Sequence, residues 1–289
     1  MNEPPILGVI GGSGLYHFNG LQDQSSMEID TPFGMPSSPV MTGTINGKKI
    51  AFLARHGIGH FINPSEVNYR ANIYALKSLG IRQVIGISAC GSLRLDYKPG
   101  EFVIPDQIID FTRNRARTFF ENGLVVHISS AEPFCPDLSA ALWEAANATE
   151  TITHKGGTTI TIEGPRFSTK AESHLFRSWG ISAIGMTTST EAFLAREAEL
   201  CYASLAHITD YDVWHVNEDP VTVEMVVRTL NANTEAAQKT IINLLAKLDD
   251  QRDCDCQHSL EKAIITHSDQ INPAALKKLD LLVGRYLAS

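Results

Sequence analysis

The sequence lacks the marks of membrane, exported and nucleic-acid-binding proteins. No apolar run in its 289 residues approaches the roughly 20 that a membrane helix needs. The first residues, Met1–Pro5, do not form the basic and apolar regions of a signal peptide. The formal net charge of −8 does not suit non-specific nucleic-acid binding, which needs a basic surface. We therefore expect a cytoplasmic protein that binds neither membranes nor nucleic acid.

Cysteine is scarce, and its spacing carries no local signal. The chain has five, Cys90, Cys135, Cys201, Cys254 and Cys256, with no CxxC and no zinc-like Cys/His pattern. An odd count without an export signal favours reduced thiols, and we expect no structural metal. A disulfide within Cys254-Asp255-Cys256 would close a small, strained ring, so free thiols in a flexible linker are the preferred interpretation. One sequence does not establish whether Cys135 and Cys201 lie close together.

What is present is an ordinary globular composition, 43% hydrophobic and 19% charged. Apolar runs alternate with helical patterns, which predicts a single α/β domain with a mixed, partly parallel sheet wrapped by helices. The predicted strands are 6–10, 40–44, 49–54, 83–87, 101–109, 157–162, 181–185 and 202–208, with a hairpin at Asn46-Gly47 and a small-residue turn at 88–92. The predicted helices are 64–79, 137–147, 169–179 and 190–200, with a long helix or helix pair over 222–248.

The last segment differs in composition. Residues 249–256 are polar and acidic, which favours a linker. Residues 258–265 then suggest a strand or helix, and 273–286 a helix with a leucine-rich face. The sequence thus predicts a main domain over 1–248 and a C-terminal extension over 249–289, which we expect to pack over the body or an interface.

A glycine-rich turn follows the first predicted strand at Gly11-Gly12-Ser13-Gly14. Glycines and short hydroxyls let backbone and side-chain donors approach an anion. The full dinucleotide motif would need a glycine at position 17, which is His17, and a P-loop lysine is absent. The turn therefore suits a phosphate better than a dinucleotide.

Two carboxylates, Asp210 and Asp212, follow the buried strand 202–208. In open α/β sheets, ligands bind at the carboxyl ends of strands, and a two-residue spacing lets both side chains enter one crevice. A protonated carboxyl donates and an ionised one accepts, so the pair suits the edge of an aminopurine. The alternative, left open by these residues alone, is a loop that uses aspartate for turn chemistry.

Seven blocks together resemble the 5′-methylthioadenosine phosphorylases of the trimeric purine nucleoside phosphorylase family. The resemblance runs from about Leu7 to about Ala246. The blocks are Gly11–Gly14, Ala54–Gly57, Ala89–Leu93, Ala131–Pro136, Glu163–Ser168, Gly185–Thr188 and Ile208–Trp214. The resemblance implies phosphorolysis of 5′-methylthioadenosine to adenine and 5-methylthioribose 1-phosphate. It also implies no cofactor, inorganic phosphate as co-substrate, and a homotrimer or dimer of trimers.

The resemblance assigns site residues by position. Around phosphate it places Ser13, Arg55, His56, Ser88, the Ala89 amide and Thr187. For the nucleoside it implies that Phe167 stacks on the purine, Met186 packs under the ribose and His60 lies near the phosphate side. His127 is expected to reach the 5′-methylthio group in the neighbouring subunit. Asp210 is the expected general acid at purine N7, kept protonated by burial, and Asp212 the expected partner of the 6-amino group.

Two other functions remain as alternatives. A related phosphorylase for 6-oxopurine nucleosides or methylthioinosine would carry asparagine in place of Asp210, according to the same resemblance. A non-catalytic nucleoside-binding protein on this fold would be expected to have lost one of the phosphate or acid groups. His207 lies in the strand before the aspartates, where we expect a satisfied strand histidine.

Overall fold

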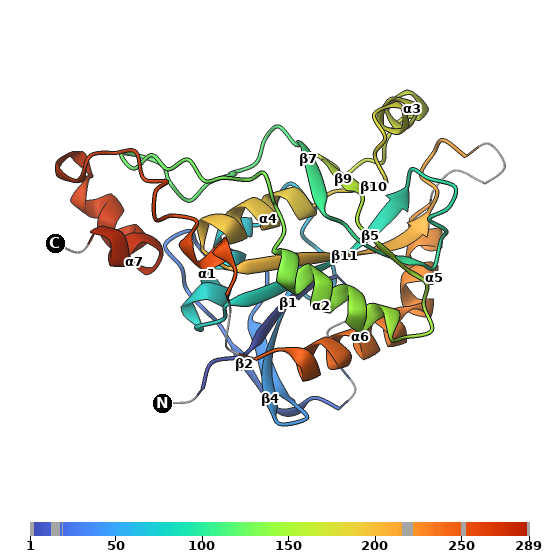
Figure 1. The fold of residues 1–289 in the computed structure, drawn as a ribbon, viewed down its shortest axis with the longest axis horizontal. Helices are drawn as coiled ribbons and strands as arrows, with labels where there is room; N and C mark the ends of the chain where they lie inside the picture. The colour runs from blue at the N-terminus through green and yellow to red at the C-terminus, as the bar shows by residue number, and fades with distance from the viewer. Residues whose placement is uncertain (1–2, 13–17, 19, 216–221, 250–252, 288–289) are drawn as a thin grey trace.

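A computed structural model describes residues 3–12, 18, 20–215, 222–249 and 253–287. In these residues a twisted mixed sheet forms the centre of the molecule (Figure 1). Its main path runs in the order β2-β3-β4-β1-β5-β10-β9-β7, and β11, β6 and β8 branch from β5. The strands are β1 Leu7–Gly11, β2 Gln22–Met27, β3 Val40–Ile45, β4 Lys48–Ala54, β5 Gln83–Ser92, β6 Phe102–Ile104, β7 Gln107–Phe111, β8 Thr153–Lys155, β9 Thr158–Ile162, β10 Ala183–Gly185 and β11 Cys201–Asp210.

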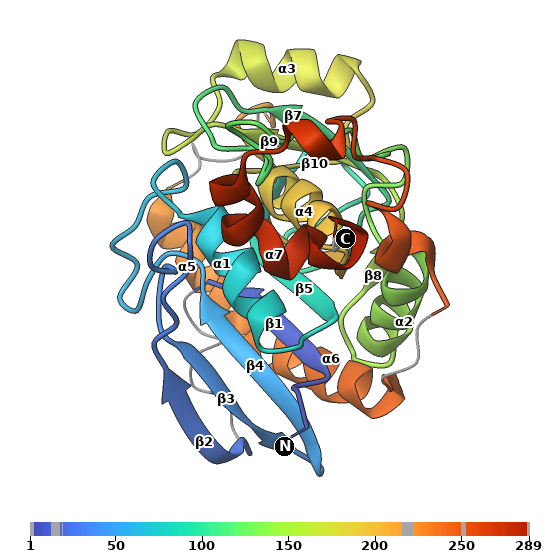
Figure 2. The ribbon, with the colours of Figure 1, turned by 90° about the vertical axis from the view of Figure 1, so that its left-hand side faces the viewer.

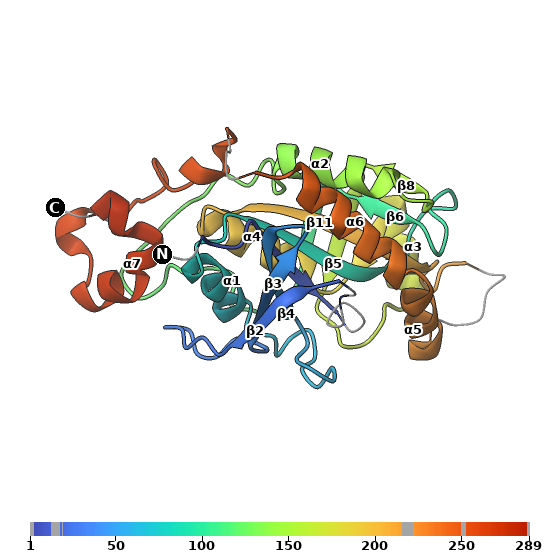
Figure 3. The same ribbon diagram turned by 90° about the horizontal axis from the view of Figure 1, so that it is seen from below.

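Helices cover both faces of this sheet, as the α/β pattern of the sequence predicts (Figure 3). One face packs against α2 and α6 in a core that includes Leu142 and Ile241. The other packs against α1 and α4 in a core that includes Ile73 and Leu194. The helices are α1 Tyr69–Ser78, α2 Pro136–Asn147, α3 Lys170–Ser178, α4 Thr188–Glu197, α5 Val223–Ala232, α6 Thr234–Lys247 and α7 Pro273–Leu287.

The parallel strands β4, β1, β5 and β11 bring their carboxyl ends to one edge of the sheet. β5 and β11 are ten residues long and run side by side, with Ala89 opposite His207 and Gly91 opposite Asp210. A Cβ on Gly91 would lie 3.0 Å from Asp210 Oδ1. The small residues of this segment therefore permit the aspartate to approach the strand. This edge is where open α/β sheets hold their ligands.

Several predicted elements are corrected by the structure. Residues 88–92 continue β5 instead of forming a turn, because their backbone pairs with β10 and β11. The predicted strand 101–109 divides into β6 and β7, where Pro105 cannot donate a ladder hydrogen bond. The helix expected from Pro64 begins at Tyr69, because the Asn68 side chain caps it through the Ala71 amide.

The segment 222–248 is a pair of helices, and residues 258–265 form neither a regular strand nor an α-helix. The strand β2 was not predicted, because all of its side chains except that of Met27 are exposed and show no apolar alternation. The helix predicted at 273–286 is confirmed as α7.

The C-terminal extension lies against the end of the body that carries α1 and α4 (Figures 1 and 2). Its side chains Leu260, Leu279, Leu282 and Val283 are buried in the same core as those two helices. The expected packing over the body is therefore observed. Among the described residues, no helix has the length and apolar character to cross a membrane.

Candidate active site

A pocket of about 730 Å³ lies at the carboxyl edge of the parallel strands. Its walls come from segments that are far apart in sequence: the turn after β1, the turn after β4, the second half of β5, the segment after β10, the end of β11 and helix α5. The pocket lining contains Arg55, His56, His60, Ser88, Ala89, Phe167, Met186, Thr187, Asp210 and Asp212. The structure therefore brings ten of the predicted site residues together. Ser13 lies outside the described residues.

Arg55 is buried at the base of the pocket, and its charge is already balanced. Its Nε and Nη2 donate to the two carboxylate oxygens of Glu191, with Nη2 3.0 Å from Oε2. Nη1 donates to the Ile87 carbonyl at 2.9 Å and Nη2 to that of Ile10 at 3.3 Å. A guanidinium has five N–H groups, so these bonds leave at most one for a ligand. Glu191 also accepts from the Tyr202 hydroxyl at 2.7 Å, which fixes the pair.

His56 directly follows Arg55 and is held as a neutral imidazole. Burial, reinforced by the neighbouring Arg55 charge, lowers the pKa of His56 to about 4. Its Nδ1 lies 2.9 Å from the Ile62 carbonyl oxygen, which only accepts, so Nδ1 carries the proton. Nε2 is then the acceptor nitrogen of this tautomer. The exposed ring of His60 stacks on that of His56, with centroids 4.4 Å apart.

Two hydroxyl groups, one from β5 and one from the residue before α4, also line the pocket. The Ser88 and Thr187 hydroxyls are both buried and lie 3.2 Å apart. Thr187 directly precedes α4 and makes no side-chain capping bond, so its hydroxyl is not used to cap the start of the helix. Together with the half-buried backbone at Ala89, they form a cluster of short donors on one side of the pocket.

Asp210 and Asp212 also line the pocket, at and just beyond the end of β11. The Asp210 carboxylate is buried and accepts from the Thr209 hydroxyl at 2.7 Å and from the Asp212 amide at 2.8 Å. Asp212 lies two residues beyond the strand end with a φ of 51°, so the backbone turns and the pair is not held by strand alternation. The Ser168 hydroxyl lies 2.7 Å from both Asp212 carboxylate oxygens. Ser168 also lines the pocket, although the sequence analysis assigned it no role.

Phe167 and Met186 complete the wall near Asp212. Phe167 is 38% exposed, which leaves its ring available for stacking. The turn beneath it contains a cis peptide at Gly164-Pro165, and a Cβ on Gly164 would lie 2.6 Å from the Met186 sulfur. Glycine is therefore required there by both its positive φ of 66° and the space taken by Met186.

Helix α5 supplies an apolar wall that the sequence analysis did not recognise as part of the site. Val223, Val226, Val227 and Leu230 line the pocket, and no α5 side chain is fully buried. In the sequence, the apolar face of this segment indicated only that a helix packs against the rest of the protein. His207 is the satisfied strand histidine that we expected, with Nε2 3.1 Å from the Asn233 amide nitrogen. Burial lowers the pKa of His207 to about 4.

His127 does not lie in the pocket of its own chain. It is exposed, and its backbone amide donates to the Ala263 carbonyl at 2.8 Å. The ten predicted residues that line the pocket therefore come together within one chain without this residue. Within the described residues, one group of His, Cys, Asp or Glu side chains is compact enough for a metal, and it lies outside the pocket.

The comparison with known families identifies this arrangement. The model of the phosphorylase superfamily matches residues 6–246, which include every site residue described above. The chain belongs to the phosphorylase superfamily. The match confirms the family that the seven sequence blocks resemble and the fold class that the alternating pattern predicted.

Relatives within this superfamily are similar over almost their whole length. The S-methyl-5′-thioadenosine phosphorylase of Geobacter sulfurreducens is 50% identical, over 98% of this chain and 99% of its own. That of Chloroflexus aurantiacus is 50% identical over 97% and 98%. A methylthioadenosine phosphorylase from an antarctic soil metagenomic library has a TM-score of 0.91 and 42% identity, covering 97% of this chain and 99% of its own.

The Schistosoma mansoni methylthioadenosine phosphorylase in complex with adenine has a TM-score of 0.80 and 37% identity, covering 84% of this chain and 91% of its own. The superfamily relatives thus include both chains that match this one through its C-terminal extension and chains that match a smaller part of it.

Proposed function

We propose that this phosphorylase cleaves 5′-methylthioadenosine with inorganic phosphate, giving adenine and 5-methylthioribose 1-phosphate. The observation that carries the proposal is one pocket lined both by a cluster of short donors and by two aspartates. A nucleoside placed between them would present C1′ to the phosphate and its base to the aspartates. Phosphate is a co-substrate, and the chemistry calls for no further cofactor.

At the phosphate end, the Ser88 and Thr187 hydroxyls and the Ala89 amide are the donors that the pocket offers. His56 Nε2 accepts from the O–H that phosphate keeps at neutral pH, which turns the unprotonated oxygens toward the sugar. Arg55 is compensated by Glu191, so its main role is to fix the β4 turn and contribute at most one N–H. Ser13 is proposed as a further donor on sequence grounds.

In the reaction, an oxygen of phosphate forms a bond to C1′ of the sugar while the bond from C1′ to purine N9 breaks. The bonding electrons pass to the purine, and the phosphate charge stabilises the oxocarbenium character of the sugar. Asp210 gives a proton to N7 of the leaving base, and Asp212 accepts from the 6-amino group. The contact between Ser168 and both Asp212 oxygens orients that carboxylate.

The 5′ substituent is proposed to face the valine and leucine wall of α5. An apolar wall suits a methylthio group better than a hydroxyl, because an unpaired buried hydroxyl loses its hydrogen bonds to water. His127 is exposed and lies outside its own pocket, which agrees with a role in the site of a neighbouring copy. Together with the family resemblance, this supports a homotrimer or a dimer of trimers, and light scattering of the purified chain should return the mass of three or six copies.

The direct test is adenine release from 5′-methylthioadenosine with and without phosphate, beside adenosine, inosine and methylthioinosine. We expect phosphate-dependent release that is fastest with methylthioadenosine. Turnover of only the 6-oxo substrates would refute the role of the aspartates in base recognition. No turnover with any substrate would favour the nucleoside-binding alternative.

A single substitution tests the general acid. Asp210→Asn keeps the shape of the side chain but removes the proton that it gives to N7. We expect kcat/KM for methylthioadenosine to fall by about 10²- to 10⁴-fold, the usual contribution of general acid catalysis. Asp30→Asn, at an exposed carboxylate outside the pocket lining, is the matched control and should leave kcat/KM unchanged. Near-normal kcat/KM in Asp210→Asn would overturn the assignment.

A further inference from the structure

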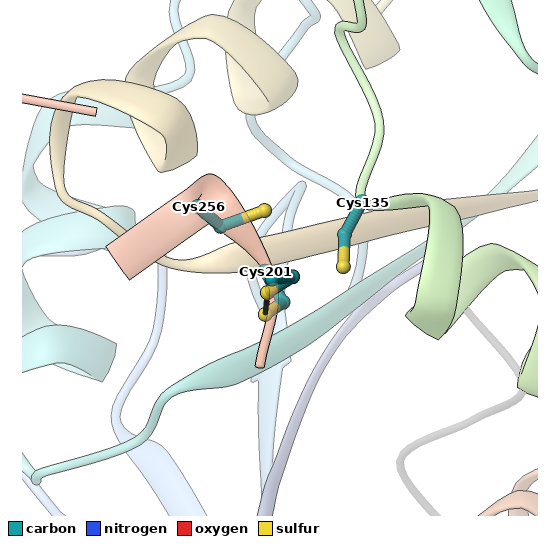
Figure 4. Close-up of side chains that lie close together, drawn as sticks. Cys135, Cys201 and Cys256 are labelled. Atoms are coloured by element: carbon teal, nitrogen blue, oxygen red, sulfur yellow. Dashed lines mark hydrogen bonds between the residues drawn. The ribbon is translucent and has the colours of Figure 1, made fainter. Parts of the chain in front are cut away.

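Four of the five cysteines meet in the interior although they come from distant parts of the chain. Cys135 is the residue before α2, Cys201 begins β11, and Cys254 and Cys256 flank the start of the 3₁₀ segment η1, Asp255–His258. All four are buried, with Cys254 the most exposed at 8%. The prediction placed Cys254 and Cys256 in a flexible linker, whereas in the structure both side chains are packed into the core of the body. Figure 4 shows the side chains of Cys135, Cys201 and Cys256 converging on one region from three different elements.

The four sulfur atoms all lie within 4.8 Å of one another, and those of Cys201 and Cys254 are 3.2 Å apart. Four thiolates bound to one Zn²⁺ at about 2.3 Å occupy a tetrahedron with edges of about 3.8 Å. The tetrahedral edge lies between the Cys201–Cys254 separation of 3.2 Å and the upper limit of 4.8 Å for all pairs. We infer that Cys135, Cys201, Cys254 and Cys256 form a structural site for one thiophilic divalent cation, with Zn²⁺ the expected occupant.

The surroundings supply what a buried metal–thiolate centre needs. Four thiolates around Zn²⁺ carry a net charge of −2, which must be compensated in the interior. Arg196 Nη1 lies 3.4 Å from the Cys256 sulfur, and the Leu138 amide lies 3.5 Å from that of Cys135. Cys135 also caps the twelve-residue helix α2, so the positive end of that helix faces its sulfur. Such contacts orient and tune the ligands of structural metal sites.

Without a cation, these side chains are expected to remain thiols. Hydrogen bonds with Cys201 and Cys256, together with burial, raise the pKa of Cys135 well above its ordinary value. Burial likewise raises the pKa of Cys254. A bound cation reverses this balance, because it favours the thiolate and releases the thiol protons to solvent. Metal binding at this site is therefore expected to weaken as the pH falls.

Disulfides are the chemical alternative, and the geometry favours the metal. A disulfide joins two sulfurs at about 2.05 Å, and a Cys254–Cys256 bond would close a very small ring. All five cysteines are within the described residues, and none forms a disulfide. Four sulfurs gathered around one point suit a single centre. Two of its ligands come from the body and two from the C-terminal extension, so the cation would fasten the start of the extension to α2 and β11.

The test begins with the full-length protein, purified under reducing conditions without chelators, and its metal content. We expect about one zinc ion per chain. After the zinc is removed, one equivalent of Co²⁺ should give the intense visible bands and the sulfur-to-cobalt charge-transfer absorption of a tetrahedral tetrathiolate site. Cys256→Ser should lose the bound metal, whereas Cys90→Ser, at a buried cysteine outside the cluster, should retain it. Arg196→Met should weaken metal affinity by about 10- to 100-fold.

The proposal fails if the reduced wild-type protein binds neither zinc nor cobalt in a stoichiometric amount. It also fails if intact-mass analysis finds these cysteines in disulfides and the reduced form takes up no metal. Should Cys256→Ser not fold, the Co²⁺ titration of the wild-type chain decides alone. An end point at one equivalent with a tetrathiolate spectrum supports the site, and a spectrum without sulfur ligation refutes it.

Discussion

Glu197, at the end of α4, is a buried carboxyl whose titration should control the pH dependence of stability. It is 5% exposed, and its oxygens accept from the Thr118 hydroxyl and the Phe119 amide, each at 2.7 Å. Burial outweighs these bonds and raises the pKa of Glu197 from 4.5 to about 7. The folded protein therefore holds a proton here that the unfolded chain releases.

The sign of the effect follows from that difference. Between pH 4.5 and 7 the folded state binds more protons, so the free energy of unfolding falls as the pH rises. The stabilisation is fully present below pH 4.5 and is lost as the pH passes through about 7. A shift of about 2.5 units, the difference between 4.5 and 7, corresponds to roughly 3 kcal/mol.

Glu197→Gln isolates this contribution, because glutamine resembles the protonated carboxyl. Its oxygen can accept from the Phe119 amide, and its amide can donate to the Thr118 hydroxyl. Denaturant unfolding of both proteins between pH 5 and 8 should show the variant gaining up to about 3 kcal/mol relative to wild type as the pH rises. Glu28→Gln, at an exposed carboxyl, makes the same charge change and should track wild type throughout. Parallel stability curves for wild type and Glu197→Gln would refute the reasoning.

Two further substitutions test the site and the extension. Ser168→Ala removes the hydroxyl 2.7 Å from both Asp212 oxygens, and a hydrogen bond to a charged group contributes about 1.5–3 kcal/mol. Steady-state kinetics should show that kcat/KM for the nucleoside falls by roughly 10- to 100-fold while the KM for phosphate is unchanged. Ser168→Thr, which keeps a hydroxyl, should have largely normal kcat/KM. An effect on the KM for phosphate alone would contradict this role. Leu282 in α7 is 3% exposed, and Leu282→Ala should lower the free energy of unfolding by about 2–5 kcal/mol in denaturant titration. Its neighbour Leu281 is 38% exposed, and Leu281→Ala should lower it by about 0.5 kcal/mol or less. Equal small effects would show that α7 does not share the core of the body.

The sequence predicted the parts of the site that follow strands. Arg55 and His56 come directly after β4, and Asp210 ends β11, so a local apolar run and the residues beyond it placed them at one edge. Residues 88–92 of β5 were assigned as a turn, yet Ser88 and Ala89, which were predicted as site residues within it, do line the pocket. Motif position was informative even where the secondary structure was wrong.

The other parts of the site and the cysteine cluster depend on contacts between segments that are distant in sequence. No local sequence pattern indicates that these segments meet. The α5 wall appears in the sequence as an ordinary apolar helix face, and only the fold shows that this face meets the pocket. Ser168 approaches Asp212 across a loop, 44 residues away in sequence. The cysteines were judged by spacing, which detects metal ligands within one hairpin or loop but not ligands that three separate elements bring together.

The extension and the segment that carries His127 are held by the same contacts. Val126 bridges Ile264, the His127 amide donates to Ala263, and the Ile265 amide donates to Val125 at 2.9 Å. Two carboxylates at and just beyond the end of α4 hold the neighbouring backbone. Glu197 accepts from the Thr118 hydroxyl and the Phe119 amide, and Glu199 accepts from the Leu260 amide at 3.2 Å. A change that loosens the extension should therefore move the backbone around His127. If His127 serves the site of a neighbouring copy, the cysteine cluster, α7 and Glu197 influence that site by positioning the paired segments 125–127 and 263–265. None of them lines the pocket described above.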